Sequence, residues 1–174
     1  LDEEQFWIAA STHRGEEEFC LNTHLKVREK YNGIKLLIAP RHIERSKEVE
    51  RLCKRYNMSF QLLNKSERIL QNKEIIIINF FGGLPRFFNR AKSVFMGKSL
   101  LKKFKKVGGQ NPIDAARMGC KIYHGPFIYN FEEIYKILNE NNITKEIESY
   151  KELGENLIKD FKVLKKDAQK YSTL

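Results

Sequence analysis

The sequence predicts an α/β domain of Rossmann-like architecture, in which a parallel sheet carries helices on both faces. Short, almost continuously apolar segments alternate with longer amphipathic ones, which is the pattern of fully buried strands joined by helices. The isoleucine run at 75–78 is the clearest such strand. The 174 residues are 41% hydrophobic and 31% charged, so the chain can form one core and is too apolar to be disordered.

The first predicted strand and helix are joined by a polar loop. Phe6–Ala10 is a short apolar run that breaks into Ser11–Gly15, and a helix is expected over Glu16–Tyr31. That helix has acids in its first turn and bases in its last, an order that complements the helix dipole. Its buried stripe is expected to comprise Phe19, Thr23, Val27 and Tyr31.

The remaining elements continue the alternation, and glycine, proline and asparagine mark their boundaries. Further strands are expected at Ile34–Ala39, Ser59–Leu63, Glu74–Asn79, Ser93–Met96 and Lys121–His124. Further helices are expected at Glu44–Tyr56, Leu84–Arg90, Pro112–Met118, Phe131–Asn141 and Tyr150–Tyr171. The last helix carries Leu153, Leu157, Phe161 and Leu164 on one side. That side packs either on this domain or partly against a second one.

Chemically distinctive loops follow the predicted strands, at the edge where open parallel sheets bind ligands. In the first loop, Ser11, Thr12 and Arg14 combine hydroxyls and a guanidinium with free helix amides, a set that suits an oxyanion or phosphate. The alternative is that Ser11 or Thr12 simply caps the helix.

The loop after the second strand places Pro40 and Arg41 at the same edge. Arg41 either clamps a phosphate or pairs with Glu44 on the surface. His13 and His42 titrate near neutrality in their unperturbed state, but lone histidines are usually structural or surface groups. We assign neither a catalytic role.

Two glycine-containing segments complete the edge. Phe81-Gly82-Gly83 lets the backbone approach a ligand, unless it is a plain turn. The segment 108–114 (Gly-Gly-Gln-Asn-Pro-Ile-Asp) places Pro112 early in a helix and Asp114 within its first turn. Asp114 either accepts hydrogen bonds from ribose hydroxyls or complements the helix dipole. Neither a Gly-x-Gly-x-x-Gly motif nor a P-loop motif is present.

The formal net charge of +10 indicates an anionic partner: nucleic acid, a membrane surface or a phosphorylated substrate. A lysine-rich proteome is the alternative explanation. Cys20, Cys53 and Cys120 have no ligand-like spacing, so reduced thiols in the cytosol are expected and no metal site is. No signal peptide or membrane span is evident. Because the chain opens with Leu-Asp-Glu-Glu, we expect it to be part of a longer protein.

Four ordered motifs resemble the C-terminal half of the 3-deoxy-D-manno-octulosonic acid (Kdo) transferases of lipopolysaccharide synthesis. They are Ser-Thr-His-Arg-Gly-Glu-Glu-Glu (11–18), Ala-Pro-Arg-His-x-Glu-Arg (39–45), Gly-Gly-Gln-Asn-Pro-Ile-Asp (108–114) and Gly-Pro-Phe-x-x-Asn-Phe (125–131). The resemblance covers nearly the whole chain.

The resemblance implies that residues 1–174 form one Rossmann-like nucleotide-sugar donor-binding domain, the C-terminal domain of a GT-B glycosyltransferase. The N-terminal acceptor domain, with the general base, would lie outside this chain. The full-length enzyme would transfer Kdo, with inversion, from CMP-Kdo to the lipid A precursor, lipid IVA, at the cytoplasmic face of the bacterial inner membrane. We expect this fragment to be soluble, to bind the donor weakly and not to catalyse transfer. No cofactor or metal is expected.

By motif, the resemblance assigns the nucleotide site to Pro40, Arg41, Phe81, Gly82, Gly83, Asn111, Pro112, Ile113 and Asp114. It also places Ser11, Thr12 and Arg14 in the donor cleft. No residue of this chain is assigned a catalytic role.

Several positions depart from the family's pattern. Asn79 and Gly83 stand where the family has acids, Asp114 stands where it has Glu, and Gln110 where it has His. Lys98 replaces the second glycine of a Gly-Gly-Ser-Leu motif. With these changes we expect backbone contacts with the nucleotide to remain and side-chain contacts to be weakened.

The segment Lys98–Val107 is about four residues longer than is usual in the family. Its apolar residues Leu100, Leu101, Phe104 and Val107 are expected to form one helical face, surrounded by five lysines. This face either contacts anionic lipid or is a solvated loop.

Two rival functions remain at this point. Another GT-B glycosyltransferase, or a nucleotide-sugar epimerase, would use a UDP or GDP donor. A basic nucleic-acid-binding module would need aromatic residues interleaved with the basic patch. Phe104 is the only aromatic in the lysine cluster, so no nucleic-acid partner is expected.

Overall fold

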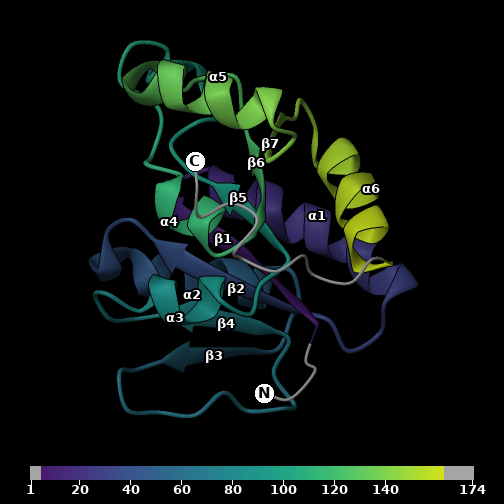
Figure 1. Cartoon of the computed structure of the whole chain (residues 1–174). Coiled ribbons are helices and arrows are strands. Elements are labelled where there is room, and N and C mark those ends of the chain that lie inside the picture. Colours follow the sequence, from purple (N-terminus) through teal and green to yellow (C-terminus); the bar gives the residue numbers. More distant parts are fainter. Residues whose placement is uncertain (1–4, 163–174) are drawn as a thin grey trace.

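The computed structural model describes residues 5–162 and confirms the predicted fold class: one seven-stranded sheet, parallel throughout, with helices on both faces (Figure 1). The strand order is β3-β4-β2-β1-β5-β6-β7. The strands are β1 (Phe6–Thr12), β2 (Lys35–Pro40), β3 (Phe60–Leu63), β4 (Ile75–Ile78), β5 (Ser93–Met96), β6 (Lys121–His124) and β7 (Thr144–Glu146). The α-helices are α1 (Glu16–Lys30), α2 (Ser46–Arg55), α3 (Leu84–Phe88), α4 (Ile113–Arg117), α5 (Glu132–Glu140) and α6 (Tyr150–Phe161).

The core has two layers, one on each side of the sheet. Helices α1, α2 and α6 cover one face, and α3, α4 and α5 cover the other. The isoleucines of β4 divide between them: Ile75 and Ile77 face the first layer, and Ile76 and Ile78 the second. Because both faces are covered, almost every position of a central strand is buried, which explains the unbroken apolar runs in the sequence.

Helix α6 docks on this domain as far as Phe161. It lies alongside α1 in Figure 1 and contributes Leu153, Leu157 and Phe161 to the core. The Asp160 carboxylate accepts hydrogen bonds from the Ser93 hydroxyl at 2.7 Å and the Tyr123 hydroxyl at 2.6 Å. Leu164 and the predicted continuation of the helix to Tyr171 lie outside the described residues.

Two elements differ from the sequence-based expectation. Strand β7 was not predicted; it is short and polar, and it pairs only with β6 at the edge of the sheet. The helix predicted from Glu44 begins instead with a 3₁₀ turn at Ile43–Arg45, and α2 starts at Ser46.

The expectation of one helical face in the 98–107 segment is wrong. The segment contains only a 3₁₀ turn at Lys102–Phe104. Phe104 is buried, with its ring centroid 5.3 Å from that of His13, while Leu100 packs on the core and Val107 is half exposed. The apolar side chains therefore do not share a single outward face.

Strand β1 is the topological switch point of the sheet, where the order in which successive strands are added reverses. The chain runs from β1 to β2 on one side, and β5 adds to the opposite side of β1. In open α/β sheets, ligands bind beyond the carboxyl ends of the strands at this switch point. The topology therefore predicts a ligand site among the loops that follow β1, β2, β4 and β5.

Candidate functional site

A cleft of about 390 Å³ lies at the carboxyl edge of the sheet and collects residues from loops that are far apart in the sequence. Eight residues assigned to the nucleotide site or donor cleft from the sequence line it: Ser11, Pro40, Arg41, Phe81, Gly82, Gly83, Asn111 and Asp114. The cleft combines one guanidinium, one carboxylate and exposed aromatic surface. Those groups match the phosphate, ribose and base of a nucleotide, respectively.

Arg41 is held at the mouth of this cleft by its backbone. Its N–H donates to the Thr12 carbonyl at 3.0 Å, just past the last paired residue of β2. The side chain is exposed and forms no ion pair with any described residue, so the expected alternative pairing with Glu44 is not formed. The guanidinium is therefore available to an anion in the cleft.

The loop after β4 forms an aromatic wall. Phe81 is 80% exposed, and Gly82 has a φ of 72°, a left-handed conformation that favours glycine. A Cβ at Gly83 would lie 2.6 Å from the Phe80 ring, so the acid that the family resemblance implies at this position has no room unless that ring moves. The guanidinium of Arg86 lies 5.0 Å from the centre of the Phe80 ring. The Phe80 ring therefore occupies the space that a side chain at position 83 would need.

The loop before α4 and the first turn of that helix supply two polar side chains to the cleft, Asn111 and Asp114. Asn111 Oδ1 accepts a hydrogen bond from the Ile113 amide at 3.0 Å, and Asp114 is exposed in the first turn of α4. Pro112 is buried and Ile113 half-buried, and neither lines the cleft. These two residues shape the turn, while Asn111 and Asp114 face the cleft.

Two of the three tentative cleft residues lie elsewhere. The Thr12 hydroxyl is buried and donates to Glu17 Oε1 at 2.9 Å. Arg14 points away from the cleft and pairs with Glu48 at 2.7 Å. Because β1 extends to Thr12, only Ser11, with a φ of 54°, reaches the cleft from this loop.

Asn79 also lies outside the cleft lining, so its replacement of an acid does not alter the cleft directly. Its amide donates to Asn64 Oδ1 at 2.9 Å. Several residues that the sequence did not indicate also line the cleft: Ile43, Phe80, Leu84, Pro85, Phe88, Met96 and Gln110. Position was the available signal for some of them: Phe80 lies two residues after β4, and Leu84 and Pro85 begin α3.

His13 makes stability depend on pH near this edge. Burial lowers the pKa of His13 from 6.5 to about 4, with nearby Lys98, His42 and Arg45 adding to the effect. The unfolded chain therefore takes up this proton first, and stability is lost as pH falls from about 6.5 to about 4. We expect His13→Gln to make that loss shallower in thermal unfolding measured at successive pH values.

The control is His42→Gln, which removes an exposed imidazole whose ring centroid lies 5.8 Å from that of His13. It should change the pH dependence much less than His13→Gln does, because His42 only adds to the effect of burial on His13. Equal effects of both substitutions would contradict the role given to burial.

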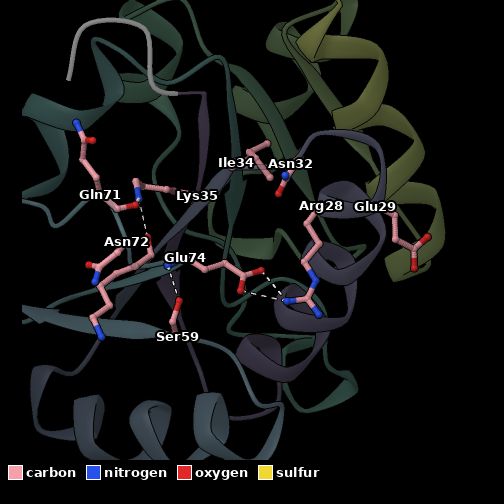
Figure 2. Close-up of a pocket in the computed structure, with 11 residues that line it drawn as sticks. Arg28, Glu29, Asn32, Ile34, Lys35, Ser59, Gln71, Asn72 and Glu74 are labelled. Atoms are coloured by element: carbon pink, nitrogen blue, oxygen red, sulfur yellow. Dashed lines mark hydrogen bonds and ion pairs between the residues drawn. The ribbon is translucent and has the colours of Figure 1, made fainter.

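A second hollow, of about 500 Å³, lies at the amino edge of the sheet. Figure 2 shows the Glu74 carboxylate bonded to Arg28, at 2.9 and 3.1 Å. The buried Lys35 amine donates to the carbonyls of Leu70, Gln71 and Lys73, at 3.3, 2.7 and 2.6 Å. The principal charged groups here are bonded to one another or to backbone, which is the pattern of a structural cluster.

Residues 5–162 contain neither a candidate metal cluster nor a candidate membrane span. That part of the chain holds no group of three or more His, Cys, Asp or Glu side chains arranged to bind a metal ion. None of its helices is both long and apolar enough to cross a bilayer. The three cysteines are buried and free.

Comparison with known proteins identifies relatives by sequence, although no protein-family model matches the chain. It is 34% identical over 143 residues to the 3-deoxy-D-manno-octulosonic acid transferase of Haemophilus influenzae, covering 82% of this chain and 33% of the relative. The enzyme of the same name from Rickettsia felis is 30% identical over 158 residues, covering 91% and 32%. The chain thus spans about a third of the length of these curated relatives.

Solved structures show the same fold. The C-terminal CMP-Kdo binding domain of WaaA from Acinetobacter baumannii matches with a TM-score of 0.82 at 21% identity, covering 91% of this chain and 81% of that one. The C-terminal domain of LpcC, a group 1 glycosyltransferase from Francisella tularensis, matches with a TM-score of 0.58 at 18% identity, covering 98% and 83%.

The fold is that of the C-terminal domains of GT-B glycosyltransferases. Within that class, the chain is a homologue of the Kdo transferases, whose curated members match it over most of its length.

Proposed function

We propose that this chain is the donor-binding domain of a Kdo transferase and that its carboxyl-edge cleft binds CMP-Kdo. The observation that carries the proposal is the convergence of Arg41, Phe81 and Asp114 from three loops on one cleft at the sheet's carboxyl edge. Arg41 would hold the phosphate, Asp114 the ribose hydroxyls, and Phe81 the face of the base. Pro112 and Ile113 would act through the shape of their turn.

The proposed reaction is transfer of Kdo from CMP to a hydroxyl of the lipid A precursor. A base would deprotonate that hydroxyl, while cations and backbone amides stabilise the departing CMP phosphate. In this proposal the present chain supplies the phosphate-stabilising groups. The acceptor domain and its base belong to a part of the enzyme outside residues 1–174.

The test is calorimetric titration of the chain with CMP, UMP and GMP at low and moderate salt. Saturable binding that prefers CMP supports the proposal. A preference for UMP or GMP would instead support a glycosyltransferase or epimerase domain that uses a UDP or GDP donor. Binding that is indifferent to the base and disappears at moderate salt would indicate only attraction to the net positive charge.

Contact with the cytoplasmic face of the inner membrane is the second part of the proposal. Four lysines of the 98–107 segment are exposed: Lys102, Lys103, Lys105 and Lys106. Each lysine near an anionic bilayer contributes about 1 kcal/mol of attraction. We expect replacement of all four by glutamine in the full-length enzyme to weaken binding to anionic vesicles at least tenfold.

The matched control replaces four exposed lysines elsewhere: Lys26, Lys47, Lys54 and Lys136. This variant has the same net charge but keeps the segment intact. If both variants bind the vesicles equally well, the segment has no specific role at the membrane.

A further inference from the structure

Glu16 is an acidic residue at the start of a helix whose side chain is completely buried. Its Oε1 accepts hydrogen bonds from the His13 amide at 3.0 Å and the Lys98 amide at 2.7 Å. Its Oε2 accepts from the Ser99 amide at 3.1 Å and the Leu100 amide at 3.2 Å. Three of the four donors belong to the loop after β5, more than 80 residues away in sequence.

These contacts lie beyond the carboxyl ends of β1 and β5, at the topological switch point of the sheet. The two strand ends approach so closely that a Cβ at Gly97 would lie 2.4 Å from the Ser11 carbonyl oxygen. Lys98 has a φ of 53°, which turns consecutive amides of its loop toward one carboxylate. Such a concave set of amides is a binding site for an anion, and here the anion belongs to the chain itself.

The loop held by Glu16 in turn holds the segment that lines the nucleotide cleft. The Lys98 carbonyl accepts from the Gly109 amide at 2.7 Å, and the Ser99 carbonyl from the Phe127 amide at 2.8 Å. Gly109, with a φ of 97°, immediately precedes the cleft residues Gln110 and Asn111. A continuous path of hydrogen bonds therefore runs from Glu16 through the 98–100 loop to the cleft.

Glu17 provides an internal contrast. It is also buried, but its carboxylate binds the Thr12 hydroxyl and Arg45, at 2.8 Å for the shorter Arg45 contact. None of its hydrogen bonds reaches the 98–100 loop. Adjacent glutamates of the same helical turn thus hold different parts of the structure.

We infer that Glu16 is a positioning residue for the nucleotide site: its carboxylate fixes the 98–100 loop and, through it, the placement of the Gly109–Asp114 segment. The inference rests on the proposed function of the cleft. It also predicts that the amides beyond the ends of β1 and β5 are not available to the ligand's phosphate. Arg41 then carries the phosphate contact.

The first test needs no nucleotide. Amide hydrogen exchange, followed by NMR, compares the unaltered chain with Glu16→Gln and Glu17→Gln. In Glu16→Gln an NH₂ group replaces one carboxylate oxygen and faces two amide donors. We expect exchange of the Lys98, Ser99, Leu100 and Gly109 amides to accelerate at least tenfold in Glu16→Gln, with little change at these amides in Glu17→Gln.

The second test compares nucleotide affinity with stability for the same variants. We expect Glu16→Gln to weaken CMP binding about tenfold or more, and Glu17→Gln to lower the melting temperature without a comparable loss of affinity. If Glu16→Gln does not fold, Glu16→Asp is the second variant. Its shorter side chain keeps a carboxylate but does not reach all four amides, so we expect smaller increases in amide exchange and a smaller loss of CMP affinity.

The outcomes separate the two proposals. If the unaltered chain does not bind CMP, the proposed function fails, while the exchange data still show whether Glu16 holds the loop. Unchanged exchange at Gly109 and the 98–100 loop in Glu16→Gln would overturn the inference. Affinity losses in the two glutamine variants that simply follow their losses of stability would also overturn it.

Discussion

Replacing Arg41 by alanine is expected to weaken CMP binding about 10- to 100-fold. Arg41 is the one cation among the residues that line the cleft in the described part of the chain. A hydrogen bond to a charged group contributes about 1.5–3 kcal/mol when its partner is in place, and each 1.4 kcal/mol corresponds to a factor of ten in affinity. Calorimetric titration of the variant and the unaltered chain at the same ionic strength measures the effect.

Arg51→Ala is the matched control for this experiment. Arg51 is exposed on α2, outside the cleft, and its removal lowers the net charge by the same amount. Equal losses of affinity in the two variants would mean that CMP responds to the overall charge of +10 and not to a defined phosphate contact. An unchanged affinity in Arg41→Ala would remove Arg41 from the site.

Replacing Lys35 by methionine is expected to lower the free energy of unfolding by about 2–3 kcal/mol without changing nucleotide affinity. Its amine is buried at the start of β2 and donates to three carbonyls of the 70–73 turn. Methionine retains the packing of the side chain but removes these donors, and hydrogen bonds to a charged donor are among the stronger ones. Chemical denaturation followed by circular dichroism measures the change.

Lys136→Met serves as the control because Lys136 is exposed on α5. That substitution should change the unfolding free energy by less than about 0.5 kcal/mol. A comparably small change in Lys35→Met would show that water can replace the amine in the turn. A large loss of nucleotide affinity in Lys35→Met would contradict the assignment of function to the opposite edge of the sheet.

The central strands and the helices were predictable because their apolar patterns are set by burial. The four isoleucines of β4 contribute to the core on both faces, so the run in the sequence could only be a fully buried segment. Strand β7 has no such signal. Thr144–Glu146 is polar, lies at the sheet edge and is a strand because β6 offers it hydrogen bonds.

The cleft was predictable in outline for a different reason. Residues that follow parallel strands must gather at one edge, and this placed Pro40, Arg41 and the Gly82-Gly83 loop together without any knowledge of side-chain contacts. The aromatic side of the cleft, formed by Phe80 and Phe81, was harder to predict. The position of the Phe80 ring beside Gly83 depends on a side-chain conformation that the sequence does not specify.

The sequence indicated only part of the role of the acids at the start of α1. Glu16 and Glu17 lie in the first turn, as expected for acids that complement the helix dipole, but both are also buried, with hydrogen-bond partners from other parts of the chain. Burial raises the pKa of Glu16, while the hydrogen bonds from backbone amides oppose that shift. Long-range contacts of this kind leave no local pattern, and so the roles of Thr12, Arg14 and Glu16 required the structure.

The most direct test of the account is a crystal structure of the chain with CMP bound. We expect the nucleotide in the cleft at the carboxyl edge, with its phosphate within hydrogen-bonding distance of Arg41, its ribose near Asp114 and its base against Phe81. The Glu16 carboxylate should still hold the amides of the 98–100 loop. CMP bound instead in the hollow beside Arg28 and Glu74, or with its phosphate displacing Glu16, would contradict the account.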